Sequence, residues 1–279
     1  MLGGFGRFTA VTQIEHDTYP PQQHVLRDLR AEFEQRGDGL GYGWLPVVDF
    51  VRNPSGSVHA GVVATLVDLL GGGLAATTVA PDWIATADLT LHVLPRPVGD
   101  EVEGVARVLR AGRTTAVIEV DLHDSFGPLG LATMSFARLV RRDDNPQVPA
   151  PGTAGRGTLA LPDSRLIRPV VDQIGFSVVD ASVGEIELPV TPYISNTLGA
   201  VQGGVVATAI VVATDAIVGA KAGAPVETVD LQVTYLSLVK AGPLRTVAHL
   251  VDAGTADVSV VDANGRVATA ATAVAVSIG

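Results

Sequence analysis

Residues 45–65 read LPVVDFVRNPSGSVHAGVVAT, and residues 188–208 read LPVTPYISNTLGAVQGGVVAT. The two stretches share 11 of 21 positions without a gap, whereas average protein composition gives about 2 matches by chance. The offset of 143 residues is the size of a whole domain and is too long for a solenoid repeat. The sequence therefore predicts two copies of one structural unit.

Composition and charge exclude several classes of protein. Of the 279 residues, 47% are apolar and 17% are charged, which indicates a folded chain with room for two domains. The net charge of −10 argues against a nucleic acid or an anionic membrane as partner. The sequence has no cysteine, so disulfides and thiolate metal sites are excluded.

No segment has the pattern of a secretory signal or a membrane span. Residues 1–11 lack a sustained apolar core, and polar side chains interrupt the most apolar stretch, residues 201–220. We therefore expect a cytoplasmic protein.

Hydrophobic periodicity predicts the same order of elements in each copy. In the first copy we expect helices at 22–35 and 61–78, a turn at 53–56, and strands at 44–51, 84–94, 101–109, 114–124 and 129–140. In the second we expect helices at 164–173 and 204–222, a turn at Asn196, and strands at 185–193, 228–236, 244–251, 256–261 and 266–277. Each unit should be α+β, with a long helix wrapped by an antiparallel sheet.

A segment rich in Pro, Gly, Asp and Arg separates the copies. It spans residues 143–163 and has neither a helical nor a strand period, which is typical of a linker. The chain therefore divides into a first domain at 1–142 and a second domain at 164–279.

The first copy resembles the hotdog-fold acyl-CoA thioesterases of the phenylacetate-pathway type. The matching residues are the turn and helix start Asn53, Gly56, His59, Ala60 and Gly61, the helix acid Asp68, the strand hydroxyl Thr86, and the pair Gly112-Arg113. The second copy matches at Asn196, Gly199, Gly203, Gly204, Thr228 and Gly254, but it has Gln202 for the histidine, Val211 for the acid and Thr255 for the arginine. The resemblance implies two tandem hotdog domains paired within the chain.

The resemblance also implies a reaction and a role for each matching residue. Asp68 matches the catalytic acid of the family and Thr86 its hydroxyl. The substrate would be an acyl-CoA, with coenzyme A as part of the substrate and no further cofactor or metal. The family often forms tetramers, so we expect a homo-oligomer of these double chains.

Helix geometry requires donors from a second helix. Thioester hydrolysis needs N–H donors on the carbonyl oxygen and a base or nucleophile at the carbonyl carbon. Gly61 and Asp68 lie seven residues apart on one helix, about 10.5 Å along the axis, too far to act on one carbonyl group. The resembling family places its site between two paired units, so the second copy is the natural partner of the first.

Two interface sites with different contents follow. In the first site, the catalytic group would be Asp68, Thr86, Asn196 and Gly203, with Gln202, Gly204, Arg110 and Arg113 binding the substrate. The second, degenerate site would combine Val211 and Thr228 with Asn53, His59, Ala60 and Gly61. The acid and the intact double glycine fall in the first site.

Each assignment has an alternative. Asp68 could be a structural aspartate, and Asp215, one turn beyond Val211, is a rival acid. Asn53 and Asn196 suit turns on their own account, and the two arginines suit solvent as well as coenzyme A phosphates. The alternative function is a module that binds acyl-CoA or another apolar ligand without hydrolysing it.

Overall fold

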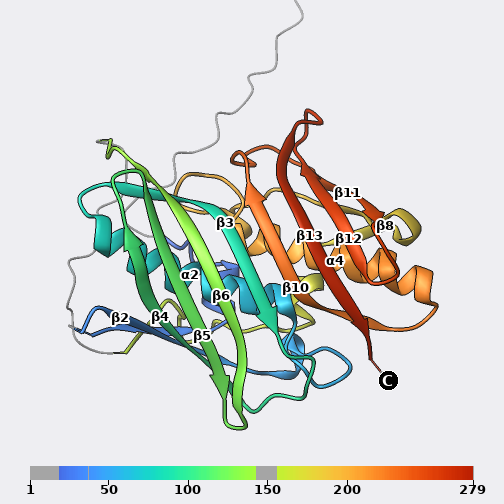
Figure 1. The fold of residues 1–279 in the computed structure, drawn as a ribbon, viewed down its shortest axis with the longest axis horizontal. Helices are drawn as coiled ribbons and strands as arrows, with labels where there is room; N and C mark the ends of the chain where they lie inside the picture. Colours follow the sequence, from blue (N-terminus) through green and yellow to red (C-terminus); the bar gives the residue numbers. More distant parts are fainter. Residues whose placement is uncertain (1–18, 37, 143–155, 279) are drawn as a thin grey trace, which may run out of the picture.

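The computed structural model describes residues 19–36, 38–142 and 156–278. Its strands form one 13-stranded sheet with the order β7-β1-β2-β4-β5-β6-β3-β10-β13-β12-β11-β9-β8. Figure 1 shows the two long helices, α2 and α4, on the same side of this sheet. The absence of a leader within residues 1–11 stays a prediction, because those residues lie outside the described part of the chain.

The first half of the chain is built around the long helix α2. Its elements are α1 (Val25–Asp28), β1 (Glu32–Gln35), β2 (Leu40–Pro46), a 3-10 turn (Asp49–Val51), α2 (Ala60–Val79), β3 (Trp83–Val93), β4 (Glu101–Ala111), β5 (Thr115–Asp124), β6 (Gly127–Leu139) and β7 (Gly157–Thr158). Helix α2 contacts strands β2 to β6.

The second half repeats this order around α4. Its elements are α3 (Val170–Ile174), β8 (Ser177–Asp180), a 3-10 turn (Ala181–Val183), β9 (Glu185–Leu188), a 3-10 turn (Pro192–Ile194), α4 (Gly203–Ala222), β10 (Val226–Tyr235), β11 (Leu244–Leu250), β12 (Thr255–Val261) and β13 (Val267–Ser277). Helix α4 contacts strands β9 to β13. The prediction of long helices covered by antiparallel strands is confirmed.

The short elements at the start of each half differ from prediction. The helix expected at 22–35 ends at Asp28, because Arg30 has a φ of +55° and Glu32–Gln35 pair with β2 as a strand. The helix expected at 164–173 begins only at Val170, because the residue before Pro169 is disfavoured in a helix. The strand expected at 44–51 runs from Leu40 to Pro46, since proline cannot continue the ladder.

The expected linker is partly described. Residues 143–155 lie outside the described residues, while Gly157–Thr158 form β7 at the edge of the sheet beside β1. This short strand extends the sheet by two residues of antiparallel pairing.

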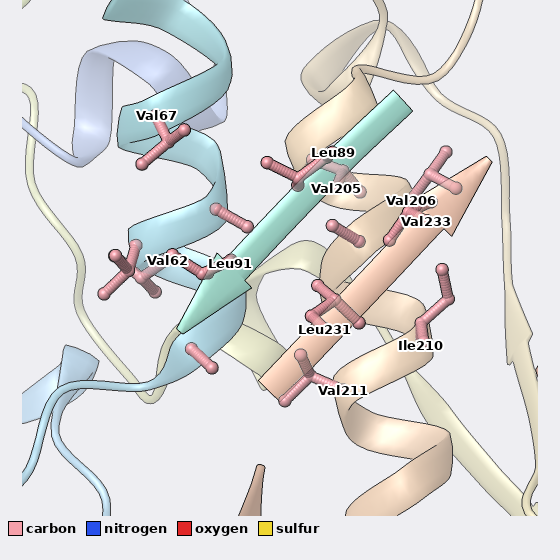
Figure 2. Packing of buried hydrophobic residues seen from close by; sticks show 14 of the residues in the cluster. Val62, Val67, Leu89, Leu91, Val205, Val206, Ile210, Val211, Leu231 and Val233 are labelled. Atoms are coloured by element: carbon pink, nitrogen blue, oxygen red, sulfur yellow. The ribbon is translucent and has the colours of Figure 1, made fainter. Parts of the chain in front are cut away.

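The halves join at the middle of the sheet and between the two helices. Strands β3 and β10 pair antiparallel, with Leu89 opposite Val233 and Leu91 opposite Leu231. Figure 2 shows these four side chains packed with valines of α2 and α4 in one apolar core. Burying each such side chain contributes roughly 1.5–3 kcal/mol.

Glycine lets the helices touch at their N-terminal ends. A Cβ at Gly61 would lie 2.7 Å from Thr208 Cα, and one at Gly204 would lie 2.4 Å from Thr65 Cα. The repeated Gly-Val-Val-Ala-Thr stretch therefore forms the contact between the two helices.

Helices α2 and α4 are both 20 residues long and nearly uniformly apolar. By length and composition alone each could cross a membrane, yet 67% of the most apolar window of each is buried inside the protein. Core helices that are covered on most sides have this composition.

Candidate active site

Asp68 on α2 faces the first turn of α4. The hydroxyl of Thr86 on β3 donates to Asp68 Oδ1 at 2.9 Å, and the backbone N–H of Gly204 donates to Oδ2 at 3.2 Å. A β-bulge between Thr86 and Asp88 interrupts the pairing with β6 at this point, and bulges commonly re-aim a side chain. The structure therefore brings together an acid and a hydroxyl from one half and a helix N-terminus from the other.

The carboxylate of Asp68 is enclosed by protein, although the residue keeps some accessible surface. Burial raises its pKa, while the hydrogen bonds from Thr86 and Gly204 act in the opposite direction. A carboxylate with a raised pKa is a stronger base than a free one.

Gly203 and Tyr235 fix the start of α4. A Cβ at Gly203 would lie 2.8 Å from Asp68 Oδ2, so a larger residue would displace the carboxylate. The hydroxyl of Tyr235, at the end of β10, donates to the carbonyl oxygen of Gly203 at 2.9 Å. Burial raises the pKa of Tyr235, and the charge of Asp68 raises it further, so the hydroxyl stays protonated as a donor.

Asn196 and Gln202 approach the same helix start in different ways. The side-chain oxygen of Asn196 accepts hydrogen bonds from the N–H groups of Leu198 at 2.9 Å and Ala200 at 3.1 Å, so Asn196 forms a turn. Of its side-chain polar atoms, Nδ2 alone is then left for a ligand. Gln202 is buried, and its Nε2 donates to the hydroxyl of Tyr19.

Tyr19 and Tyr235 were not predicted as site residues. Tyr19 lies outside the repeated stretch, and Val93 stands at the place in β3 that corresponds to Tyr235 in β10. Comparison of the two copies therefore gives no signal for either tyrosine.

Arg110 and Arg113 lie apart from this cluster. Both are exposed, one near the end of β4 and one in the turn that follows. Strands β6 and β5 separate β4 from β3 in the sheet, so about 14 Å lies between these arginines and Thr86 along the sheet. They could contact only a remote part of an extended ligand.

The halves also meet around Val211, Thr228 and the start of α2, and we call this place the second seam; the first seam is the one that contains Asp68. Among the described residues, no acid is bonded to the start of α2 in the second seam. Val211 is buried there, and the N–H of Gly61 is bonded instead to Nδ1 of its own N-cap residue, His59, at 3.1 Å. Burial lowers the pKa of His59 to about 4, so the ring is neutral and can accept this bond. Ala60 and Gly61 are both buried.

A carboxylate that the sequence patterns did not reveal fills this second seam. Oε2 of Glu227, on β10, accepts hydrogen bonds from Asn53 Nδ2 at 3.1 Å, Ser55 Oγ at 2.7 Å and Ser57 Oγ at 2.5 Å. Glu227 is 2% exposed, and its Oε1 has no hydrogen-bond partner among the described residues. Asn53 therefore ties the two halves together through a side chain of the protein itself.

Ionisation of Asp215, which lies next to this seam, should make the stability of the protein depend on pH. Its Oδ1 accepts a bond from Thr228 at 2.7 Å, and burial, with Glu227 adding to it, raises its pKa to about 7. Between about pH 4 and pH 7 the folded state therefore holds one proton more than the unfolded state. The stabilisation that comes from this proton is present at low pH and is lost as the pH rises through 7. Ionisation of Asp215 lowers the free energy of unfolding by at most about 4 kcal/mol. The cost is smaller than this upper bound because the residue keeps some contact with water.

We therefore expect Asp215→Asn to stabilise the protein more at pH 8 than at pH 5. Urea unfolding of both proteins at the two pH values measures this difference. An equal free-energy change at pH 5 and pH 8 would contradict the raised pKa.

The first seam has the parts for acyl transfer without a metal ligand set. The N–H groups of the first turn of α4 are donors at the positive end of a helix dipole, and Asp68 is the opposing base or nucleophile. Within residues 19–36, 38–142 and 156–278, no group of three His, Asp or Glu side chains could hold a metal ion.

Comparison with known proteins agrees with this fold. The model of the thioesterase superfamily matches residues 55–130. A Halobacterium salinarum protein provisionally named an esterase is 30% identical over 128 residues, 43% of this chain and 82% of that protein. A similarly named Caenorhabditis elegans protein is 36% identical over 70 residues, 25% of this chain and 41% of that protein.

A solved structure extends the likeness to both halves. The acyl-ACP thioesterase from Bacteroides thetaiotaomicron matches with a TM-score of 0.60 and 12% identity, covering 86% of this chain and 98% of that chain. At this identity the match shows the fold alone: a hotdog-type thioesterase fold with an antiparallel sheet and a central helix. Together with the relative from H. salinarum, these findings mean that the chain belongs to the thioesterase superfamily.

Proposed function

We propose that this protein hydrolyses acyl-CoA thioesters at the seam that contains Asp68. One observation carries the proposal: the carboxylate of Asp68 faces the N–H of Gly204 from the opposite half at 3.2 Å. Membership of the thioesterase superfamily supports the reaction class. The similarity to phenylacetate-pathway enzymes supports coenzyme A as the carrier, with Arg110 and Arg113 as candidate phosphate contacts.

The reaction follows from the two sides of the seam. The thioester carbonyl oxygen takes the N–H groups at the start of α4, where the helix dipole favours the negative charge that develops on it. Asp68 then faces the carbonyl carbon and acts as a base on water or as a nucleophile. Both routes consume one water molecule, break the C–S bond, and release the carboxylic acid and the free thiol of coenzyme A.

The proposal assigns one productive site to each chain. Residues 1–142 and 164–279 act as two hotdog units paired within the chain, and among the described residues only one seam has an acid bonded to the first turn of the opposite long helix. In the other seam, Glu227 is bonded to the turn of the first half and His59 caps the start of α2. No equivalent of Asp68 faces Gly61, because Val211 stands at that position.

A thiol-release assay on acyl-CoAs of increasing chain length tests this function directly. We expect saturable release of free thiol with one substrate bound per chain by calorimetry. Saturable binding of acyl-CoA with no thiol released would instead identify a binding module. Two equivalent binding sites per chain would contradict the single productive seam.

A further inference from the structure

The N-terminal segment, residues 19–31, belongs to the first half but is bonded to the second. The buried ring of His24 donates from Nε2 to the carbonyl oxygen of Ser195 at 2.9 Å, in the loop that leads to α4. Asp28 Oδ2 accepts a bond from the hydroxyl of Tyr193 at 2.9 Å. The segment is thus fixed against the loops that precede α4.

This segment holds Tyr19 in one place. Nε of Arg27 donates to the carbonyl oxygens of Pro21 at 2.7 Å and Pro20 at 3.1 Å, which fixes the backbone next to Tyr19. The ring of Tyr19 meets the ring of His24 edge to face, with centroids 5.4 Å apart and planes at 72°. Such aromatic pairs have a preferred geometry and limit the freedom of the ring.

The hydroxyl of Tyr19 is bonded to a side chain at the start of α4. Gln202 occupies the N-cap position of this helix, and its side chain makes no capping bond to the helix; it donates from Nε2 to Tyr19 instead. Gln202 is 8% exposed, so its carboxamide has little contact with water. The two residues that follow Gln202 meet Asp68: a Cβ at Gly203 would lie 2.8 Å from Asp68 Oδ2, and the N–H of Gly204 donates to the same oxygen at 3.2 Å. Burial raises the pKa of Tyr19, and the charge of Asp68 adds to this effect.

The other helix start is built differently. There the N-cap residue His59 directs its side chain to its own helix, by accepting the N–H of Gly61. Capping is the ordinary use of an N-cap side chain. The carboxamide of Gln202 is held away from this use at the seam where an acid, Asp68, accepts the N–H of a helix start from the opposite half.

We propose that Tyr19 is a positioning residue for the reaction proposed above: it holds the carboxamide of Gln202 beside Asp68 at the start of α4. This inference rests on the proposed function. With Nε2 bonded to Tyr19, Oε1 of Gln202 has no hydrogen-bond partner in the part of the chain that the structure describes, and it can accept a hydrogen from the hydrolytic water. A water that donates to both Gln202 and Asp68 keeps a lone pair free to attack the carbonyl carbon.

The test compares Tyr19→Phe, Gln202→Ala and the double variant in steady-state thiol release. We expect each single variant to lower kcat about tenfold with KM changed less than about twofold, because orientation of the reacting group is lost and substrate binding is kept. The kcat of the double variant should be no lower than that of the slower single variant, since both changes remove the same contact. Tyr193→Phe is the matched control: it removes a hydroxyl that anchors the same N-terminal segment, and its kcat should stay that of the wild type.

Three results would overturn the role of Tyr19 while leaving the proposed function intact. They are an unchanged kcat in Tyr19→Phe, multiplied losses in the double variant, or an equal loss in Tyr193→Phe, which would make the hydroxyl merely structural. Failure of the proposed function is recognised separately, because the wild-type protein would then release no thiol at all.

Discussion

Asp68→Asn protein is expected to release thiol from acyl-CoA about a thousandfold more slowly than the wild type. An amide is neither a base nor a nucleophile at neutral pH, and loss of such a group typically costs about 10²- to 10⁴-fold in rate. Asparagine has nearly the same volume, and its oxygen can still accept the hydroxyl of Thr86. The amide nitrogen would face the N–H of Gly204, so one hydrogen bond worth about 1 kcal/mol is lost while a buried charge is removed.

The control is the same substitution at the other seam. Asp215 also accepts a bond from a threonine of the neighbouring strand, Thr228, but no helix N-terminus of the opposite half is bonded to it among the described residues. Asp215→Asn should therefore keep its rate of thiol release. Initial rates at saturating acyl-CoA and thermal unfolding of both variants measure the contrast. Loss of activity in Asp215→Asn with activity kept in Asp68→Asn would place the reaction at the second seam.

Gly204→Ala is expected to cost about 3 kcal/mol of stability or more and about a hundredfold in thiol release. The new Cβ would lie 2.4 Å from Thr65 Cα, a backbone atom of the facing helix that cannot turn aside. The helices must therefore separate, and overpacking of this kind costs about 1–3 kcal/mol or more. The N–H that faces Asp68 moves with the helix, and a displacement of about 1 Å in a site can cost 10²-fold in rate.

Gly73→Ala provides the matched comparison in the other long helix. Among the described residues a Cβ there meets only Gln35 Nε2, at 3.7 Å, so the alanine fits without movement. Alanine in a helix interior is favoured over glycine by up to about 1 kcal/mol, and Gly73→Ala should be as stable as the wild type or more so. Urea unfolding separates the two glycines. Equal stability of both variants would mean that the helices do not meet closely at Gly204.

The strongly patterned parts of the chain were predictable. Both long helices and the strands at 83–93, 101–111, 115–124 and 127–139 lie within a few residues of the expected bounds. Long apolar runs and alternating strands carry their own periodicity, which local sequence is sufficient to reveal. The helix expected at 22–35 failed because its second part pairs with β2, and long-range pairing outweighed the helical spacing of its apolar residues.

The site was predictable where the repeat itself contains it. Asp68 and Gly204 belong to or adjoin the repeated stretch. Helix geometry excludes the start of the same helix as the donor for an acid at position 68, and the family resemblance implies the paired helix instead. Glu227 was not predictable, because its partners lie 170 to 174 residues away and contribute short polar side chains with no pattern of their own. The turn expected at Asn196 is confirmed, because its side-chain oxygen accepts the N–H groups of Leu198 and Ala200.

Two related units and two long apolar helices can be predicted from the sequence, because repeated and periodic patterns are local features of the chain. The family resemblance adds the expectation that an acid lies opposite the intact double glycine. Which side chains meet at the seam depends on the tertiary structure: Tyr19 with Gln202, Tyr235 with Gly203, and Glu227 with the turn at Asn53. Such contacts depend on the crossing of two helices and on the meeting of β3 with β10, which no local pattern encodes.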